Sequence, residues 1–128
     1  MSIEVAVYNR LTEELNIDVF PLVLPPTITL PACTFRRISG VPEYTHNGDS
    51  LLERIRWQFD IWADTYAEAS QQGDTLRAAW SGYSGQVYET PAIYISAAFI
   101  LGRRDLYEAQ TSSYRVSMDV SMWVRTVE

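Results

Sequence analysis

Two segments of the chain alternate apolar and polar residues with a period of two, which is typical of strands that bury one face. In residues 51–62, every second residue from Arg54 to Asp60 is charged or polar, and the residues between them are apolar. The same alternation covers residues 114–125, where valine or methionine follows Tyr114 at every second position. We therefore predict two strands, each with one buried face and one polar face.

Two other segments place apolar residues at the three- and four-residue spacing of an α-helix. Residues 2–16 follow this spacing near the start of the chain. Residues 66–81 follow it again, and the pattern stops at Gly82, a residue type that commonly ends helices. Thr65 and Glu68 have the spacing of a capping box, which satisfies the free backbone N–H groups at a helix start. The sequence predicts two helices.

The remaining segments complete the predicted fold. Four prolines make residues 19–32 an extended connector, because proline lacks a backbone donor and disfavours helix in the residue before it. It leads into a strand at residues 32–39, and residues 92–101 form an apolar strand. Gly73, on the apolar side of the second helix, lets another backbone come close. The expected fold class is α+β: an antiparallel or mixed sheet of about four strands with two helices packed on one face.

Length and cysteine content narrow the class of protein. The 128 residues favour one domain, residues 1–128, large enough to bury a core without metals or disulfides. Cys33 is the only cysteine, so nothing indicates an oxidising compartment, and the first twenty residues do not resemble a secretory signal. The longest apolar stretch is far shorter than the ~20 residues of a membrane-spanning helix. We expect an intracellular protein with no membrane partner.

The charge balance makes direct nucleic-acid binding an unfavourable interpretation. The formal net charge is −6, and all ten basic residues are arginines. An acidic surface repels the phosphate backbone, and no basic stripe with interleaved aromatic residues is present in the sequence.

The polar faces of the two alternating strands combine arginine with tryptophan. Two interpretations stay open: a solvated face with stray tryptophans, or a surface covered by another subunit, since both residue types are enriched at strong interfaces. The candidate interface residues on this face are Arg54, Arg56, Asp60, Arg115, Asp119, Trp123 and Arg125.

Residues 39–50, "SGVPEYTHNGDS", hold the only histidine and several other polar groups, and could form a small metal or catalytic site. Scattered ligands without a strict spacing are weak evidence for a metal, whereas asparagine and glycine suit a tight turn. We predict a loop of about a dozen residues that joins two strands and is long enough to contact a neighbour. Its candidate contact residues are Glu43, Tyr44, His46 and Asp49.

Catalytic and cofactor motifs are absent from the sequence. Cys33 lies in a predicted strand, and nothing places His46 beside it as a base. No phosphate-binding loop, dinucleotide fingerprint or helical pair of metal ligands occurs. We predict no enzymatic activity, no cofactor and no metal.

Three segments together resemble the DUF3168 family of tailed-phage tail completion, or tail terminator, proteins. They are "VFPLVLPPTITLPACTFRRISGVPEYTHNGDS", "QFDIWADTYAEA" and "RDLYEAQTSSYRVSMDVSMWVR", in an order that covers most of the chain. The resemblance implies a structural virion protein with an α+β fold and no catalytic residues. It also implies a hexameric ring, assembled in the host cytoplasm, at the head-proximal end of a siphophage tail.

The resemblance implies a set of partners as well. These are further copies of the chain in a ring, the tail tube protein, the head-tail connector protein, and DNA that passes through the lumen without specific binding. An acidic subunit suits such a channel, because like charge avoids trapping phosphates. Two alternatives stay open: another head-tail structural part, such as a head-completion or tail-tube protein, and a small cytoplasmic enzyme that uses His46 and nearby carboxylates.

Overall fold

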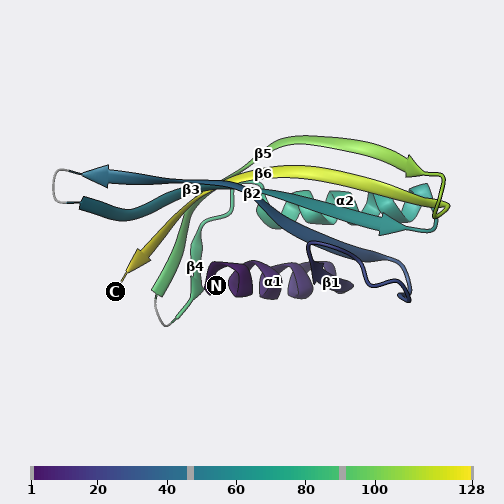
Figure 1. The fold of residues 1–128 in the computed structure, drawn as a ribbon, viewed down its shortest axis with the longest axis horizontal. Helices are drawn as coiled ribbons and strands as arrows, with labels where there is room; N and C mark the ends of the chain where they lie inside the picture. The colour runs from purple at the N-terminus through teal and green to yellow at the C-terminus, as the bar shows by residue number, and fades with distance from the viewer. Residues whose placement is uncertain (1, 46–47, 90–91, 128) are drawn as a thin grey trace.

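The protein forms two helices and one six-stranded sheet in a computed structural model that describes residues 2–45, 48–89 and 92–127. Figure 1 shows the elements in chain order. The sheet order is β1-β2-β3-β6-β5-β4. The elements are α1 (Ser2–Leu15), β1 (Asp18–Pro21), β2 (Ala32–Thr45), β3 (Gly48–Ala63), α2 (Tyr66–Trp80), β4 (Gly85–Tyr88), β5 (Ala92–Glu108) and β6 (Ser113–Val127).

The four predicted strands form the centre of the sheet, and two further strands border it. The long strands β2, β3, β6 and β5 pair antiparallel. The sequence did not predict β1, which pairs parallel with β2 inside the proline-rich connector, or β4, which pairs with β5 after the turn that follows α2. Each of these edge strands has four residues, too few for an alternation to be recognised. The sheet is therefore mixed and has six strands instead of about four.

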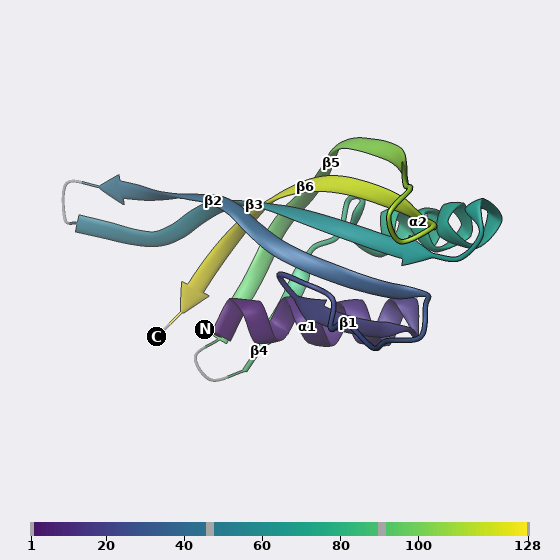
Figure 2. The ribbon, with the colours of Figure 1, turned by 45° about the vertical axis from the view of Figure 1, so that its right-hand side comes forward.

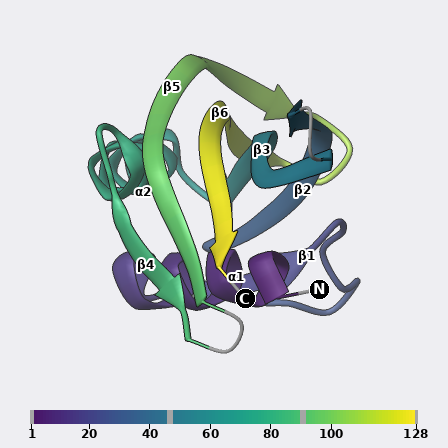
Figure 3. The ribbon, with the colours of Figure 1, turned by 90° about the vertical axis from the view of Figure 1, so that its left-hand side faces the viewer.

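Both helices pack against the concave side of the curled sheet, as Figures 2 and 3 show. Leu11 of α1 and Trp80 of α2 join one core with the inward-facing residues of the sheet. The predicted apolar positions of β3 and β6 are all in that core, from Ile55 to Ile61 and from Val116 to Val124. No helix among the described residues has the length and apolarity needed to cross a membrane.

The predicted start, end and close packing of α2 agree with the structure. The Glu68 N–H donates to the Thr65 hydroxyl oxygen at 3.2 Å, and Gly82 has a φ of 72° just after the last turn. A Cβ added at Gly73 would lie only 3.0 Å from a methyl carbon of Val116 and from the guanidinium carbon of Arg103. The glycine therefore allows α2 to lie directly on β6 and β5.

The segment at residues 39–50 joins two strands as predicted, but it is not a loop of about a dozen residues, because β2 continues to Thr45 and β3 begins at Gly48. Tyr44 pairs with Asp49, and Thr45 pairs with Gly48. The pairing of β3 with β6 stops at Leu52, so residues 42–45 of β2 and 48–51 of β3 extend beyond the rest of the sheet. We call these two paired segments the hairpin arm, and Figure 1 shows them projecting past both helices. Pro42, Glu43 and Tyr44 are all exposed, so this described part of the arm has no alternation of buried and exposed residues that the sequence could reveal.

Candidate interaction surface

The face of the sheet turned away from the helices carries the polar positions of the two alternating strands. Arg54 lies opposite Trp123, and Gln58 lies opposite Asp119, across the pairing of β3 with β6. Gln58, Asp119 and Trp123 are each flanked in their own strand by residues of the buried core, and Arg54 lies between Glu53 and the buried Ile55. We call this surface the outer face; it holds the candidate residues Arg54, Arg56, Asp60, Arg115, Asp119, Trp123 and Arg125.

Asp119 is the carboxylate around which two outer-face arginines gather. Arg56 donates from Nη2 to Asp119 Oδ2 at 3.0 Å, and Arg104 on β5 approaches the other carboxylate oxygen at 3.8 Å. The Asp119 side chain is only 14% exposed, whereas both arginine side chains are about half exposed. Asp119 thus lies between two guanidinium groups, and Arg104 also donates from Nη2 to the Ser117 hydroxyl at 3.1 Å.

The tryptophans of the outer face are covered by arginines. The guanidinium carbon of Arg54 lies 5.8 Å from the centre of the Trp123 ring, and that of Arg115 lies 5.1 Å from the Trp62 ring. The Trp62 indole N–H also donates to the Thr34 hydroxyl at 3.4 Å. Such cation–π pairs hold arginine and tryptophan side chains in defined positions. Both tryptophan rings of the outer face therefore pack against arginine side chains of the same chain.

Two exposed apolar residues on β5 extend the outer face and were missed in the sequence. Phe99 is 53% exposed and lies opposite Ser121, and Leu101 is 52% exposed. The sequence predicts burial for the whole apolar segment, but irregular pairing near Ile95 and near Ile100 interrupts the alternation. Leu101 borders a hollow of about 270 Å³ that is also lined by Ser39, Val41, Arg54, Arg56 and Ser121.

The outer face has the opposite charge sign to the chain as a whole. The central part of the outer face runs from the paired residues level with Asp60 to those level with Arg125. Among its described residues, the only carboxylates are those of Asp60 and Asp119. The same area holds five arginines, while the formal net charge of the chain is −6. The negative charge is therefore concentrated elsewhere on the molecule. The five arginines are Arg36, Arg54, Arg56, Arg104 and Arg125.

Three of the four candidate residues of the 39–50 segment, Glu43, Tyr44 and Asp49, lie in the paired strands of the hairpin arm. Glu43 and Tyr44 are exposed in β2, and Tyr44 is 69% exposed. Asp49 is placed by its backbone pairing with Tyr44, and His46 lies outside the described residues. Among the residues that the structure does describe, no three His, Cys, Asp or Glu side chains gather as a metal site would need. The arm is a projection from the sheet.

Cys33 is fully buried in β2, beside β1 and β3. Burial raises the pKa of its thiol, and the nearby Asp60 carboxylate raises that pKa further. Because the thiolate is the reactive form, this environment makes Cys33 an inert part of the core.

The chain was compared with known proteins by sequence and by structure. The sequence model of the family described as tail completion protein gp17 matches residues 6–125. No curated protein matches the chain significantly. A chain from the virion of a native gene transfer agent particle has a similar fold, with a TM-score of 0.72 and 12% sequence identity. That match covers 97% of this chain and 95% of the other.

Proposed function

The chain belongs to the family of tail completion protein gp17, and on that premise we propose that it forms a closed ring at the head-proximal end of a tail tube. Membership of this family makes it a structural protein of a phage tail and not an enzyme. The observation that carries the proposal is the family match, which reaches from α1 to the last residues of β6. The resemblance to tail terminators favours six subunits in the ring.

A ring that ends a tube needs two unlike axial faces, so that one face binds the last tube subunits and the other prevents further addition. Head-to-tail contacts between identical subunits produce such a ring when the rotation closes. The two sides of this chain are unlike, as those contacts require. The outer face is rich in arginine, whereas α1 and α2 together carry five carboxylates and two arginines.

The outer face is the proposed contact with the next subunit in the ring. Its arginines would meet the acidic helical side of that subunit, and its exposed Phe99 and Leu101 would be covered there. We assign this contact to the candidate residues Arg54, Arg56, Asp60, Arg115, Asp119, Trp123 and Arg125. The hairpin arm, with Glu43, Tyr44, His46 and Asp49, is assigned to contacts between subunits or along the ring axis.

The remaining partners follow from a position at the end of the tail. One axial face would bind the tail tube protein and the other the head-tail connector protein, while DNA passes through without specific binding. Because a basic surface would hold phosphates in place, we propose that the outer face is turned toward a neighbouring subunit and away from the lumen. The acidic residues on the other surfaces of the subunit could then line the channel through which DNA passes.

Electron microscopy of the purified protein, with and without tail tubes, tests this proposal. The expected result is a closed ring on one end of each tube and no further growth of the tube. Growth of the protein into tubes of its own would instead identify a tail-tube subunit. Binding to the connector alone would identify a head-completion protein.

A further inference from the structure

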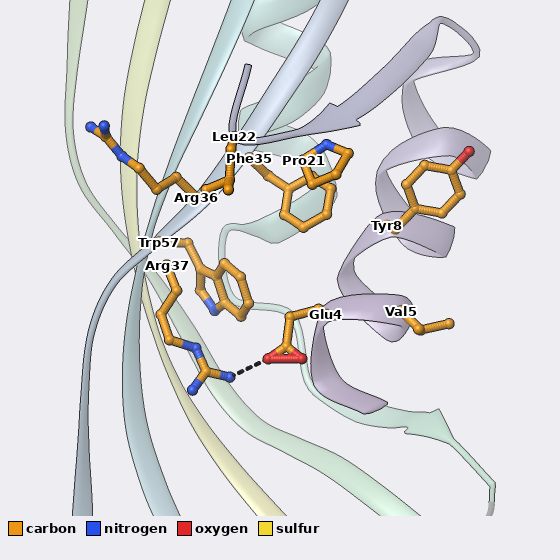
Figure 4. Close-up of a pocket in the computed structure, with 9 residues that line it drawn as sticks. All are labelled: Glu4, Val5, Tyr8, Pro21, Leu22, Phe35, Arg36, Arg37 and Trp57. Atoms are coloured by element: carbon orange, nitrogen blue, oxygen red, sulfur yellow. Dashed lines mark hydrogen bonds and ion pairs between the residues drawn. The ribbon is translucent and has the colours of Figure 1, made fainter. Parts of the chain in front are cut away.

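An apolar pocket of about 620 Å³ opens between α1 and the beginning of β2 (Figure 4). Tyr8 of α1 lies on one side, and Phe35 of β2 lies on the other. Trp57 of β3 lies deepest, since only 1% of it is exposed. Leu22, just after β1, is 65% exposed at this pocket. A pocket lined by aromatic and aliphatic residues in this way is suited to hold an apolar or aromatic side chain.

The pocket also presents an unused hydrogen-bond donor. The indole Nε1 of Trp57 is buried and has no hydrogen-bond partner. Figure 4 shows it on the side of the ring toward Arg37, which forms a 2.8 Å ion pair with Glu4. Buried donors of native proteins are nearly always paired, and leaving one unpaired costs about 1–3 kcal/mol. An oxygen atom of an occupant of the pocket would satisfy this donor.

Beside the pocket, β2 has an open edge. β1 pairs with β2 only as far as Phe35, and Leu22, whose φ is 66°, turns the chain away after donating to the Phe35 carbonyl. Beyond Phe35, the described part of β2 pairs with β3 alone. An unpaired strand edge is a template for another extended segment.

We propose that this pocket receives the hairpin arm of a second copy of the chain, with Tyr44 inserted toward Trp57. Tyr44 is 69% exposed, and its ring and hydroxyl match an apolar pocket that contains a free N–H donor. The segment around it carries Glu43 and Asp49 and no basic residue apart from His46. The charged residues that line the pocket are Arg36, Arg37 and Glu4, and Glu4 pairs with Arg37, so one positive charge is left in excess. The occupant and the pocket thus have complementary charge.

The arm cannot enter the pocket of its own chain. The pocket and the arm lie on the same strand, since β2 continues from Phe35 to Tyr44 with two register shifts on the way. At about 3.3 Å per residue, the nine steps from Phe35 to Tyr44 span up to roughly 30 Å. A contact between two different surfaces of one chain joins subunits head to tail, and repeated contacts of this kind close into a ring. The inference therefore rests on the proposed ring and adds to the outer face a second contact between neighbouring subunits.

Disulfide trapping between two single variants tests the contact. Tyr44→Cys and Leu22→Cys are purified separately, mixed under assembly conditions with tail tubes present, and oxidised. The expected product is a covalent dimer that contains one chain of each variant. The buried Cys33 stays out of the reaction in both proteins. The matched control replaces Tyr44→Cys by Tyr107→Cys, an exposed tyrosine close to the opposite end of the sheet, and is expected to give no such dimer.

A second variant tests the proposed hydrogen bond between the Trp57 indole N–H and the Tyr44 hydroxyl. Tyr44→Phe keeps the ring and removes the hydroxyl, so self-association should weaken about fivefold, the equivalent of one neutral hydrogen bond. If the oligomer forms normally but yields no mixed disulfide, the arm contact is overturned and the proposed ring stands. The same conclusion follows if Tyr107→Cys gives as much mixed disulfide as Tyr44→Cys. A wild-type protein that stays monomeric, both alone and with tail tubes, would overturn the arm contact and the ring together.

Discussion

Asp105 lies in a cluster of hydrogen-bonded side chains with Tyr66 and Arg103. The Tyr66 hydroxyl donates to the Asp105 carboxylate at 2.6 Å, and Arg103 approaches the other oxygen at 3.2 Å. The hydrogen bond from Tyr66, followed by the charge of Arg103, holds the pKa of the Asp105 carboxyl below its ordinary value. The same hydrogen bond raises the pKa of Tyr66. This cluster ties the start of α2 to β5 on the helix side of the sheet.

Removing the Tyr66 hydroxyl should change how stability depends on pH. A carboxyl whose pKa is lower in the folded state stabilises it above the pKa of the unfolded chain, and that contribution disappears as the pH falls through the folded pKa. In Tyr66→Phe the pKa of Asp105 should rise toward its ordinary value. The free energy of unfolding should then be higher for the wild type than for the variant, and this difference should be larger at neutral pH than at acidic pH.

Carboxyl NMR titration of Asp105, with urea unfolding at several pH values, measures both effects. Tyr107→Phe is the matched control, because no hydrogen bond from its hydroxyl to a carboxylate is recorded among the described residues. An unchanged Asp105 titration in Tyr66→Phe would contradict the assigned cause.

The elements differ in how far the sequence predicts them, and packing explains the difference. β3 and β6 alternate clearly because each packs one face on the core and leaves the other exposed. β1 and β4 were not predicted, since short edge strands depend on pairing with a neighbour more than on a residue pattern. On the outer face, the arginines and tryptophans of β3 and β6 were predicted, but Arg36 and Arg104 on the neighbouring strands were not. Phe99 and Leu101 were missed as well, because irregular pairing in β5 exposes an apolar run.

The contact between α2 and the sheet should not tolerate a large side chain at Gly73. Gly73→Val places branched carbons where a Cβ alone would already lie 3.0 Å from Val116, which is fully buried. We expect a loss of about 1–3 kcal/mol in the free energy of unfolding, as for other overpacked cores. Ala78→Val, at an exposed position of the same helix, is the control and should cost less than about 1 kcal/mol. Equal losses in the two variants would show that α2 does not pack closely at Gly73.

The hairpin arm should contribute little to the thermal stability of the fold. Replacing residues 43–50 by a two-residue turn removes a segment whose described residues pair only with one another, so the melting temperature should change by no more than a few degrees. Tail completion, measured as the fraction of tails that join heads, should be blocked. A large loss of thermal stability would instead mean that the arm supports the core.

At the scale of the whole molecule, the uneven distribution of charge is the feature that matters for assembly. The outer face is rich in arginine and exposes Phe99 and Leu101, while the helices carry an excess of carboxylates. Net charge alone, which is −6, would not indicate this separation. The sequence suggested a face of arginine and tryptophan residues on two strands. The residues of the two neighbouring strands that share this face could be identified only from the pairing register of all four strands.

Trp123→Ala tests whether the outer face is buried between subunits. The substitution removes a half-buried ring under Arg54, at the surface proposed to meet the next subunit. Self-association, followed by sedimentation, should weaken by at least about tenfold, the effect expected of an interface residue worth more than about 1.4 kcal/mol. Circular dichroism should show an unchanged monomer. Wild-type oligomer mass in the variant would count against the outer face as an interface.

The pairing of β3 with β6 also has a consequence for the rate of folding. Each of the other long antiparallel pairs joins strands that follow one another in the chain, whereas β3 and β6 pair residues as far apart as Leu52 and Arg125. The entropy of closing so long a loop must be overcome before any contact along this pair is gained. The two hairpins on either side are local in sequence and need no such closure. The slowest step in forming the sheet is therefore expected where its two halves meet, beneath the surface proposed to join subunits.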